Sequence, residues 1–332
     1  MARVGYDTKM WSVLAESEGP LSLAQIAEKT NFDPLLLKRF LRYYQSFRML
    51  SQPGDDAYVA NNVTKALAGP DGVAVEYFTT VLQKPFEAVP RYLKSHNYDN
   101  PTNPSDSPWQ EGYETKLHPF AWLQSNAEHF ELFMQWVHLS RAGLPMWFDV
   151  FPFDQIVGKG SDKDTILFVD VGSALGHQSI ALRQRFPDLL GRIIIQDTAQ
   201  VIGAVQPSHD IESQIYDFFT PQPVRGARAY YLRNIVHDWA DEQVVMILKN
   251  QITAMSEDSV ILLDDMVLPE KDSPWRATQL DMTMLAALAA MERSETQWHA
   301  LLEKAGLEIV KIWKYTEECD DSIVVAKPKK VA

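Results

Sequence analysis

Two segments hold the residue types that could do chemistry. The first, VDVGSALGH over 169–177, is an apolar strand followed by a turn between Gly172 and Gly176. Such a turn before a helix presents backbone N–H groups and the positive end of a helix dipole, so it suits a nucleotide-like cofactor. The second, YYLRNIVHDWADE over 230–242, places His237 at the end of a later strand. There an imidazole can remove a proton from a substrate in the same crevice.

The elements that must position these residues follow from Thr165 onward, where apolar strands and helices alternate. This alternation predicts an α/β fold, a doubly wound Rossmann-like sheet with helices on both faces. A closing hairpin argues against a dehydrogenase sheet, and the segment GSALGHQS lacks the G-x-G-x-x-G spacing that NAD-dependent oxidation needs. The expected strands are 165–171, 192–197, 214–217, 227–236, 259–266, 308–315 and 322–329, and the expected helices are 177–186, 241–255 and two between 277 and 305.

The N-terminal third predicts a separate, mostly helical domain. Helices are expected over 6–15, over 23–29 with Ser22 as its cap, and after Asp33, which caps DPLLLKRFLRYYQSF. A Pro-Gly turn then marks a hairpin between residues 49 and 60. Three helices and a hairpin are typical of a winged helix. One interpretation is DNA binding through Lys38, Arg39 and Arg42; the other is a dimerisation module whose cations form a solvated helix face.

Composition bounds the class of protein. The 332 residues carry a formal charge of −13, and residues 1–150 hold 13 Lys and Arg against 17 Asp and Glu, so no basic patch favours nucleic acid. Cys319 is the only cysteine of the sequence, which fits a reducing compartment. No apolar run reaches the length of a membrane span, and the N-terminus lacks a signal-peptide pattern. We therefore expect a cytoplasmic protein with no membrane and no nucleic-acid partner.

Taken together, VDVGSALGH, LRNIVHDW, the strand that ends at Asp197 and the MERS element at 291–294 resemble a class I, S-adenosylmethionine-dependent O-methyltransferase. The similarity is to the fungal and plant small-molecule type with an N-terminal winged-helix dimerisation domain, and it covers nearly the whole chain. It implies S-adenosylmethionine as cofactor, a small-molecule acceptor and a homodimer. It also implies a dimerisation domain at 1–70, a helical connector with substrate-pocket residues at 71–155 and a cofactor-binding domain at 156–332.

The resemblance also assigns the cofactor site. Asp197 lies 25 residues after Gly172, where a carboxylate can accept both ribose hydroxyls; helix capping is the alternative. Phe218 is expected to cover the adenine, with core packing as the alternative. Ser173 and Ala174 replace glycines of the family, which narrows the space for the methionine moiety, and we expect cofactor binding to survive. The cofactor-binding residues implied are Gly172, Asp197, Asp217, Phe218, Arg233 and Trp239.

For the reaction, the resemblance implies His237 as general base, flanked by Asp265 and Glu292. A histidine near its ordinary pKa of about 6.5 is suited to take a hydroxyl proton at physiological pH. Two alternatives stay open: Asp264 instead of Asp265 points inward, or Glu292 helps to cap the helix after Ser294. We identify no metal site.

The acceptor pocket is assigned in the same way. The family's pocket segment corresponds to EHFELFMQWVHLS, in which Phe130 and Met134 lie four apart on one helical face, although such residues are also typical of a core. Met284 and Leu288 are expected to line the other side of the pocket. Some members of the family have a polar residue that contacts the substrate at the position of Leu288. An apolar lining favours a flat aromatic or polyketide-derived acceptor.

Two questions stay open at this point. Some fungal proteins of this family are pericyclases or dehydratases that use the cofactor only as a fixed charge or not at all; the retained His237 favours methyl transfer, while Ser173 and Ala174 favour the alternative. A regulator with a vestigial enzyme domain is a third class, against which the acidic balance argues. Met1 also begins almost on the first expected helix, which predicts a truncated chain or an alternative gene start and leaves the dimer interface in question.

Overall fold

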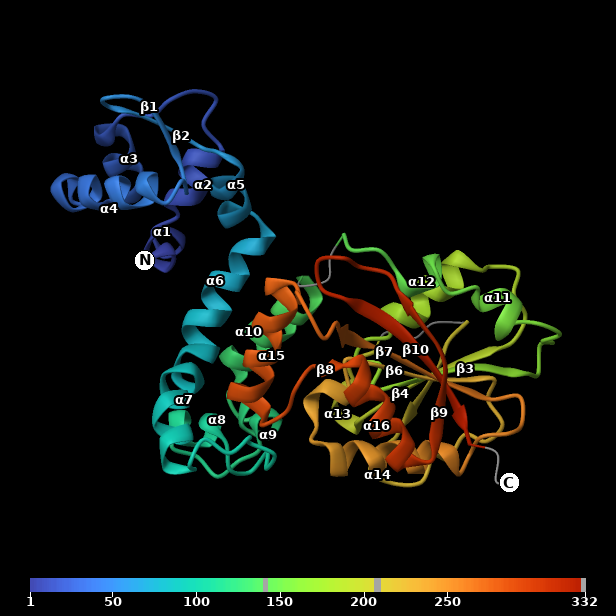
Figure 1. Cartoon of the computed structure of the whole chain (residues 1–332). Helices are drawn as coiled ribbons and strands as arrows, with labels where there is room; N and C mark the ends of the chain where they lie inside the picture. The colour runs from blue at the N-terminus through green and yellow to red at the C-terminus, as the bar shows by residue number, and fades with distance from the viewer. Residues whose placement is uncertain (140–142, 206–209, 330–332) are drawn as a thin grey trace. The chain divides into compact units, whose positions relative to one another are not determined.

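The computed structural model describes residues 1–139, 143–205 and 210–329 of the chain (Figure 1). The chain divides into two compact units. The first comprises 1–87 and 117–143, and the second comprises 88–116 and 144–332. No helix within the described residues is long and apolar enough to cross a bilayer.

The first unit begins with five helices and a two-stranded hairpin. The cap at Ser22 is a capping box, because its hydroxyl accepts from the Gln25 N–H and the Gln25 side chain accepts from the Ser22 N–H. Asp33 accepts from the Leu36 N–H at 2.8 Å. The helices are α1 (Ala2–Asp7), α2 (Met10–Ala15), α3 (Leu23–Thr30), α4 (Pro34–Ser46) and α5 (Asn62–Ala68), and the hairpin is β1 (Ser51–Gly54) with β2 (Ala57–Val59).

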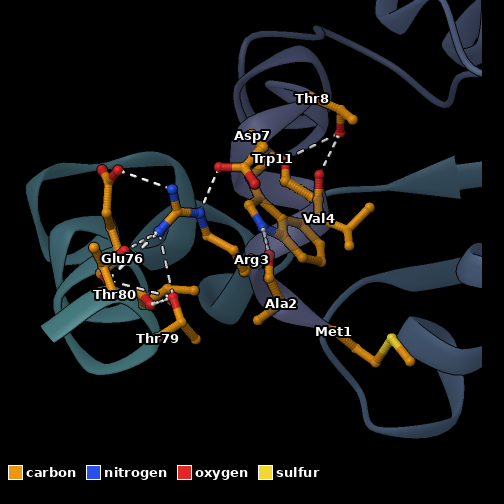
Figure 2. A network of polar contacts seen from close by, with 12 residues as sticks. Met1, Ala2, Arg3, Val4, Asp7, Thr8, Trp11, Glu76, Thr79 and Thr80 are labelled. Carbon is orange, nitrogen blue, oxygen red and sulfur yellow. Dashed lines mark hydrogen bonds and ion pairs between the residues drawn. The ribbon is translucent and has the colours of Figure 1, made fainter. Parts of the chain in front are cut away.

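The single helix expected over 6–15 is wrong. The chain forms two helices there, and the break falls at Lys9, whose φ of 56° is left-handed. The Thr8 hydroxyl donates to the Val4 carbonyl at 2.7 Å and so closes the end of α1 (Figure 2). Periodic apolar residues did not reveal this break because Tyr6, Met10 and Trp11 still pack into one core.

Arg3 joins this helix pair to the rest of the first unit (Figure 2). Its guanidinium contacts Asp7 within α1 and, from a distant part of the chain, the Glu76 carboxylate at 3.0 Å and the Thr80 hydroxyl at 2.8 Å. Thr80 lies in the π-helix η2 (Phe78–Leu82), which continues α6 (Val73–Tyr77). The remaining elements of this region are η1 (Pro70–Gly72), α7 (Gln83–Ser95), α9 (Pro119–Gln124) and α10 (Ala127–Leu139).

The second unit confirms the predicted α/β fold with its doubly wound sheet. The strand order is β5-β4-β3-β6-β7-β10-β9; all neighbours are parallel except the pairs of β10 with β7 and with β9. A short β8 pairs with the end of β7. The strands are β3 (Ile166–Val171), β4 (Arg192–Asp197), β5 (Glu212–Ile215), β6 (Ala229–Arg233), β7 (Val260–Leu268), β8 (Arg293–Ser294), β9 (Leu307–Lys314) and β10 (Asp321–Pro328).

Helices lie against both faces of this sheet (Figure 1). Each face has its own hydrophobic core. One core packs the sheet against α14 (Asp241–Ile252) and α16 (Glu295–Ala305), with Trp298 completely buried. The other packs it against η3 (Trp147–Asp149), α11 (Phe153–Ile156) and α12 (His177–Arg185). The near-continuous apolar strands of the sequence reflect this double coverage. The remaining helices are α8 (Pro108–Tyr113), α13 (Ala199–Ile202), η4 (Val236–Asp238) and α15 (Trp275–Leu288).

Candidate active site

The carboxyl ends of the parallel strands bring the predicted site residues to one edge of the sheet. β3 leads into Gly172, β4 ends at Asp197, and β6 ends at Arg233 shortly before His237. Ligands of open α/β sheets bind outside this edge, at the point where the strand order reverses. The reversal lies at β3, which has β4 on one side and β6 on the other.

The glycine turn after β3 needs a glycine at its first position. Gly172 has φ of 72°, and a Cβ there would lie 2.5 Å from Cδ1 of Ile235. The N–H groups of Gly172 and Ser173 both donate to the Gln196 carbonyl, at 2.8 and 3.1 Å. Ala174 also adopts a left-handed φ, of 49°, although it has a side chain. Ala174 therefore adopts a left-handed backbone conformation that glycine favours and that alanine disfavours.

Asp197 holds this turn from the next strand. One carboxylate oxygen accepts from the Ala174 N–H at 2.9 Å and the other from the Thr198 N–H at 2.7 Å. Burial raises the pKa of Asp197, and these two N–H donors counteract the rise. The N-cap of α13 is Thr198, so Asp197 does not cap that helix as the alternative required. A carboxylate has about four lone-pair sites, so Asp197 keeps capacity for two hydroxyls, as a ribose diol requires.

Aromatic rings gather beside the loop that follows β5. Asp217 is exposed and accepts from the Phe219 N–H at 2.9 Å. Phe218 is half-buried, with its ring centroid 5.0 Å from that of Phe219 and 6.0 Å from that of Trp239. A partly exposed aromatic face next to an exposed carboxylate fits a flat heterocycle with an amino group. The strand itself is shifted from the predicted 214–217, so that Asp217 lies beyond its end.

Arg233 makes its ion pair with Asp264, whose carboxylate lies 3.6 Å from the guanidinium. Asp264 also accepts from the Tyr231 hydroxyl and, at 2.6 Å, from the Tyr315 hydroxyl. Burial raises the pKa of Asp264, while Arg233 and the two tyrosines counteract the rise. Arg233 and Asp264 thus belong to one buried network that joins β6, β7 and the end of β9.

His237 is paired with Glu292 inside the protein. The imidazole is 8% exposed, its Nδ1 lies 2.7 Å from Oε1 of Glu292, and its Nε2 lies 3.4 Å from Oδ1 of Asp238. Burial alone would lower the pKa of His237, but the charges of Glu292 and Asp238 and the hydrogen bond with Glu292 raise it to about 10. The imidazole is therefore a stronger base than the ordinary histidine that the sequence suggested.

Asp265 is placed differently from Glu292. Its side chain is 1% exposed, and neither carboxylate oxygen has a hydrogen-bond partner among the described residues. Burial raises the pKa of Asp265 well above its usual value, against the opposing charge of His237. Asp264 and Asp265 are both buried and, as neighbours in β7, face opposite sides of the sheet. Asp265 thus influences His237 through its charge alone, whereas Glu292 forms a hydrogen bond with it.

Glu292 is held by residues that the sequence reasoning missed. Its N–H donates to Asp281 at 2.9 Å, and the neighbouring Arg293, which is 1% exposed, donates to the carbonyls of Val236 and Trp239 at 3.0 and 2.9 Å. Arg293 thereby ties the strand of Glu292 to the turn of His237. Glu292 does not cap α16, which was the alternative role for it, because Ser294 and Gln297 form the capping box of that helix.

The four expected acceptor contacts lie in different units. Met284 and Leu288 are buried on α15, in the second unit. Phe130 and Met134 are half-buried on α10, in the first unit. Trp136 of the same helix stacks on Tyr77, with centroids 5.6 Å apart and ring planes at 12°. Within the described residues, no group of three His, Cys, Asp or Glu side chains is placed to hold a metal ion.

The sheet order, the glycine turn and the acidic strand end define the class I S-adenosylmethionine-dependent methyltransferase fold. Residues 163–308 match the family model of the O-methyltransferase domain. Among curated proteins, the chain is 36% identical to demethylsterigmatocystin 6-O-methyltransferase of Aspergillus parasiticus, covering 99% of this chain and 85% of that protein. It is 38% identical to O-methyltransferase okaF of Penicillium ochrochloron, covering 99% and 86%.

Solved structures give the same result. The complex of LepI with S-adenosylmethionine has a TM-score of 0.90 and 33% identity, over 99% of this chain and 85% of that one. A second solved structure with the same TM-score, identity and coverage is described as a pericyclic reaction enzyme. The chain belongs to the S-adenosylmethionine-dependent O-methyltransferase family and is an enzyme of that family, related to those of fungal secondary metabolism.

Proposed function

We propose that this enzyme methylates a hydroxyl group of a small aromatic or polyketide-derived secondary metabolite, with His237 as the general base. The observation that carries the proposal is the buried pair of His237 and Glu292 at the carboxyl edge of the sheet, with 2.7 Å between Nδ1 and Oε1. The acceptor class rests on the curated relatives and on the apolar side chains of Met284 and Leu288.

The cofactor-binding roles follow from the donor chemistry of the same edge. We assign Asp197 to the ribose hydroxyls, Asp217 and Phe218 to the adenine, and Trp239 to the packing beside it. Gly172 lets the backbone of the turn after β3 approach the ligand closely. Arg233, at the end of the neighbouring strand β6, contributes a positive charge. When bound, S-adenosylmethionine supplies an electrophilic methyl group on a positively charged sulfur.

The chain's own part is to move one proton. A carboxylate only accepts hydrogen bonds, so Glu292 keeps a proton on Nδ1 of the neutral imidazole and leaves Nε2 as the acceptor. Nε2 of His237 takes the proton of the acceptor hydroxyl, which makes that oxygen the nucleophile. The methyl–sulfur bond of the bound cofactor would break as the new bond forms, and S-adenosylhomocysteine would be the leaving group. A pKa of about 10 for His237 matches that of a phenol, about 10, so the proton transfer itself costs little free energy. Only the neutral form of His237 can accept the proton, and with this pKa it is the minor form near pH 7. Glu292 then stabilises the resulting imidazolium through the hydrogen bond at Nδ1, and we propose Asp265 as the acid that flanks His237 from β7.

The solved structure described as a pericyclic reaction enzyme supports a second candidate: pericyclic or dehydratase chemistry on the same scaffold. Calorimetric titration with S-adenosylmethionine and S-adenosylhomocysteine, followed by methyl-transfer assays on phenolic acceptors, separates the two. Comparable or tighter binding of the product and turnover that His237→Ala abolishes support methyl transfer. His299→Ala is the matched control, because His299 is an exposed histidine of α16. Retained turnover by His237→Ala would remove His237 as the base, and a strong preference for the charged cofactor would favour the second candidate.

The first 70 residues are proposed to pair two chains into a homodimer located in the cytoplasm. Helix α4 supports the pairing, because Leu35 is 73% exposed and Phe47, at the end of the helix, is 64% exposed. Tyr43, one turn before Phe47, extends this apolar face, and the two rings lie 4.7 Å apart. We propose residues 71–155 as connector and pocket segment and 156–332 as the cofactor-binding domain.

A further inference from the structure

Three glutamine side chains form a hydrogen-bonded chain inside the second unit. Gln196 and Gln251 are completely buried and Gln222 is 3% exposed. Gln196 and Gln222 form a reciprocal amide pair, with Nε2 to Oε1 distances of 2.9 Å in both directions. Gln222 Nε2 also donates to Gln251 Oε1 at 2.8 Å. An amide buried without partners costs several kcal/mol, so these contacts specify one arrangement of the three side chains.

These glutamine side chains hold the loop 216–222 in place through hydrogen bonds. Gln251 Nε2 donates to the Tyr216 hydroxyl at 3.1 Å, and that hydroxyl donates to the Thr220 carbonyl at 2.8 Å. Gln222 itself closes the loop at its other end. Asn250, next to Gln251 on α14, donates to the Phe218 carbonyl at 3.1 Å. Both ends and the middle of the loop are therefore attached to side chains of α14 and β4.

Gln196 connects the same loop to the other proposed cofactor contacts. Its carbonyl accepts the N–H groups of Gly172 and Ser173, and it directly precedes Asp197. Its side chain meanwhile holds Gln222. One residue thus joins the glycine turn, the acidic strand end and the loop of Phe218, which come from three separate parts of the sequence.

We propose that Gln222, together with Gln196 and Gln251, forms a positioning network that sets the affinity for the adenosine half of the cofactor. The inference rests on the proposed cofactor-binding roles of Asp197 and Phe218. None of the three amides contacts the cofactor; they act by holding the residues that do. Because amides do not titrate, the network holds the loop equally well at every pH at which the protein is folded.

The test compares Gln222→Met with the wild type by calorimetric titration with S-adenosylhomocysteine and with adenosine. Methionine has similar length and volume but lacks the amide, so the loop loses its attachment. We expect binding of both ligands to weaken by about tenfold, as is common when a supporting shell is removed. In steady-state assays, the KM for S-adenosylmethionine rises while kcat and the KM for the acceptor stay unchanged.

Ser259→Ala is the matched control. Ser259 is also buried and donates to the Ala227 carbonyl at 2.6 Å, but it lies at the amino end of β7, the opposite edge of the sheet. Its loss lowers stability without changing ligand affinity. Unchanged affinity in Gln222→Met, or equal weakening in Ser259→Ala, would overturn the inference. Should Gln222→Met fail to fold, Gln251→Met tests the other end of the network. A wild type that binds neither ligand would instead overturn the proposed function, and the inference with it.

Discussion

Nδ1 of His237 lies 2.7 Å from Oε1 of Glu292, although 55 residues separate the two in the chain. The contact joins η4, which follows β6, to the residue directly before β8, and Arg293 fastens the two segments together through the carbonyls of Val236 and Trp239. The hydrogen bond fixes the orientation and the tautomer of the imidazole. It also makes Glu292 the largest of the carboxylate contributions that raise the pKa of His237, ahead of Asp238, and this carboxylate can be removed by substitution.

Glu292→Gln tests this dependence. The carboxylate helps to raise the pKa of His237 to about 10, so its removal lowers that pKa. In a plot of log kcat/KM against pH, the ascending limb of the variant is expected at lower pH than that of the wild type. We expect kcat to fall by tenfold or more, because the amide supports the imidazolium less well.

The same acceptor must be used for both proteins, so that its own ionisation is common to the two profiles. Glu295→Gln, which changes an exposed acid three residues further on, is expected to leave the profile in place. A limb that stays at the wild-type pH in Glu292→Gln would show that Glu292 does not set the basicity of His237.

The sequence predicted the sheet well because its strands are apolar on both faces and end in recognisable turns. It could not predict how Asp264 and Asp265 divide their roles, since both are equally buried and only the pleat of β7 sends them to opposite faces. Arg293 was missed because a buried arginine next to an acid gives no signal without its distant carbonyl partners. The pKa of His237 was misjudged for the same reason: the hydrogen bond with Glu292, which helps to raise that pKa, joins residues that are 55 positions apart in the chain.

Ala174→Gly tests the strain in the turn after β3. Ala174 has φ of 49°, a conformation that costs a residue with a Cβ about 1 kcal/mol or more. Glycine relieves that cost but loses about 0.4–1 kcal/mol through the greater freedom of the unfolded chain. We expect a net gain of up to about 1 kcal/mol in the free energy of unfolding, measured by urea denaturation.

Ser173→Gly is the neighbouring control. Ser173 has no left-handed φ, so glycine there only adds freedom to the unfolded chain and should lower stability. If Ala174→Gly is destabilised as much as Ser173→Gly, the turn does not store the strain that we ascribe to it.

Asp170→Asn should change how stability depends on pH. Asp170 is 2% exposed, and burial raises its pKa to about 7, although the Ser179 hydroxyl at 2.7 Å and Arg233 counteract the rise. A raised folded-state pKa stabilises the fold below pH 4, and this contribution is lost as the pH rises through 7. The difference from the ordinary value corresponds to about 4 kcal/mol between those limits.

Asparagine accepts the same hydrogen bond without titrating. We therefore expect the free energy of unfolding of Asp170→Asn, relative to the wild type, to increase between pH 4 and pH 8 in urea denaturation series. Asp258→Asn, at an exposed acid that pairs with Arg228, gives the control slope. A constant difference between Asp170→Asn and the wild type over that range would mean that Asp170 is ionised in the folded protein throughout.

Phe47→Glu tests the proposed pairing of two chains through α4. Phe47 is 64% exposed and extends the apolar face of Leu35 and Tyr43, so a second copy that covers this face would bury the ring. A carboxylate at the same place would have to lose its hydration on pairing, which costs several kcal/mol without a partner charge. Sedimentation velocity is expected to give a dimer for the wild type and a monomer for Phe47→Glu. Val310→Glu, which places the same charge on an exposed residue of β9, should remain dimeric. A wild type that sediments as a monomer, or a Phe47→Glu variant that stays dimeric, would contradict the use of α4 as the interface.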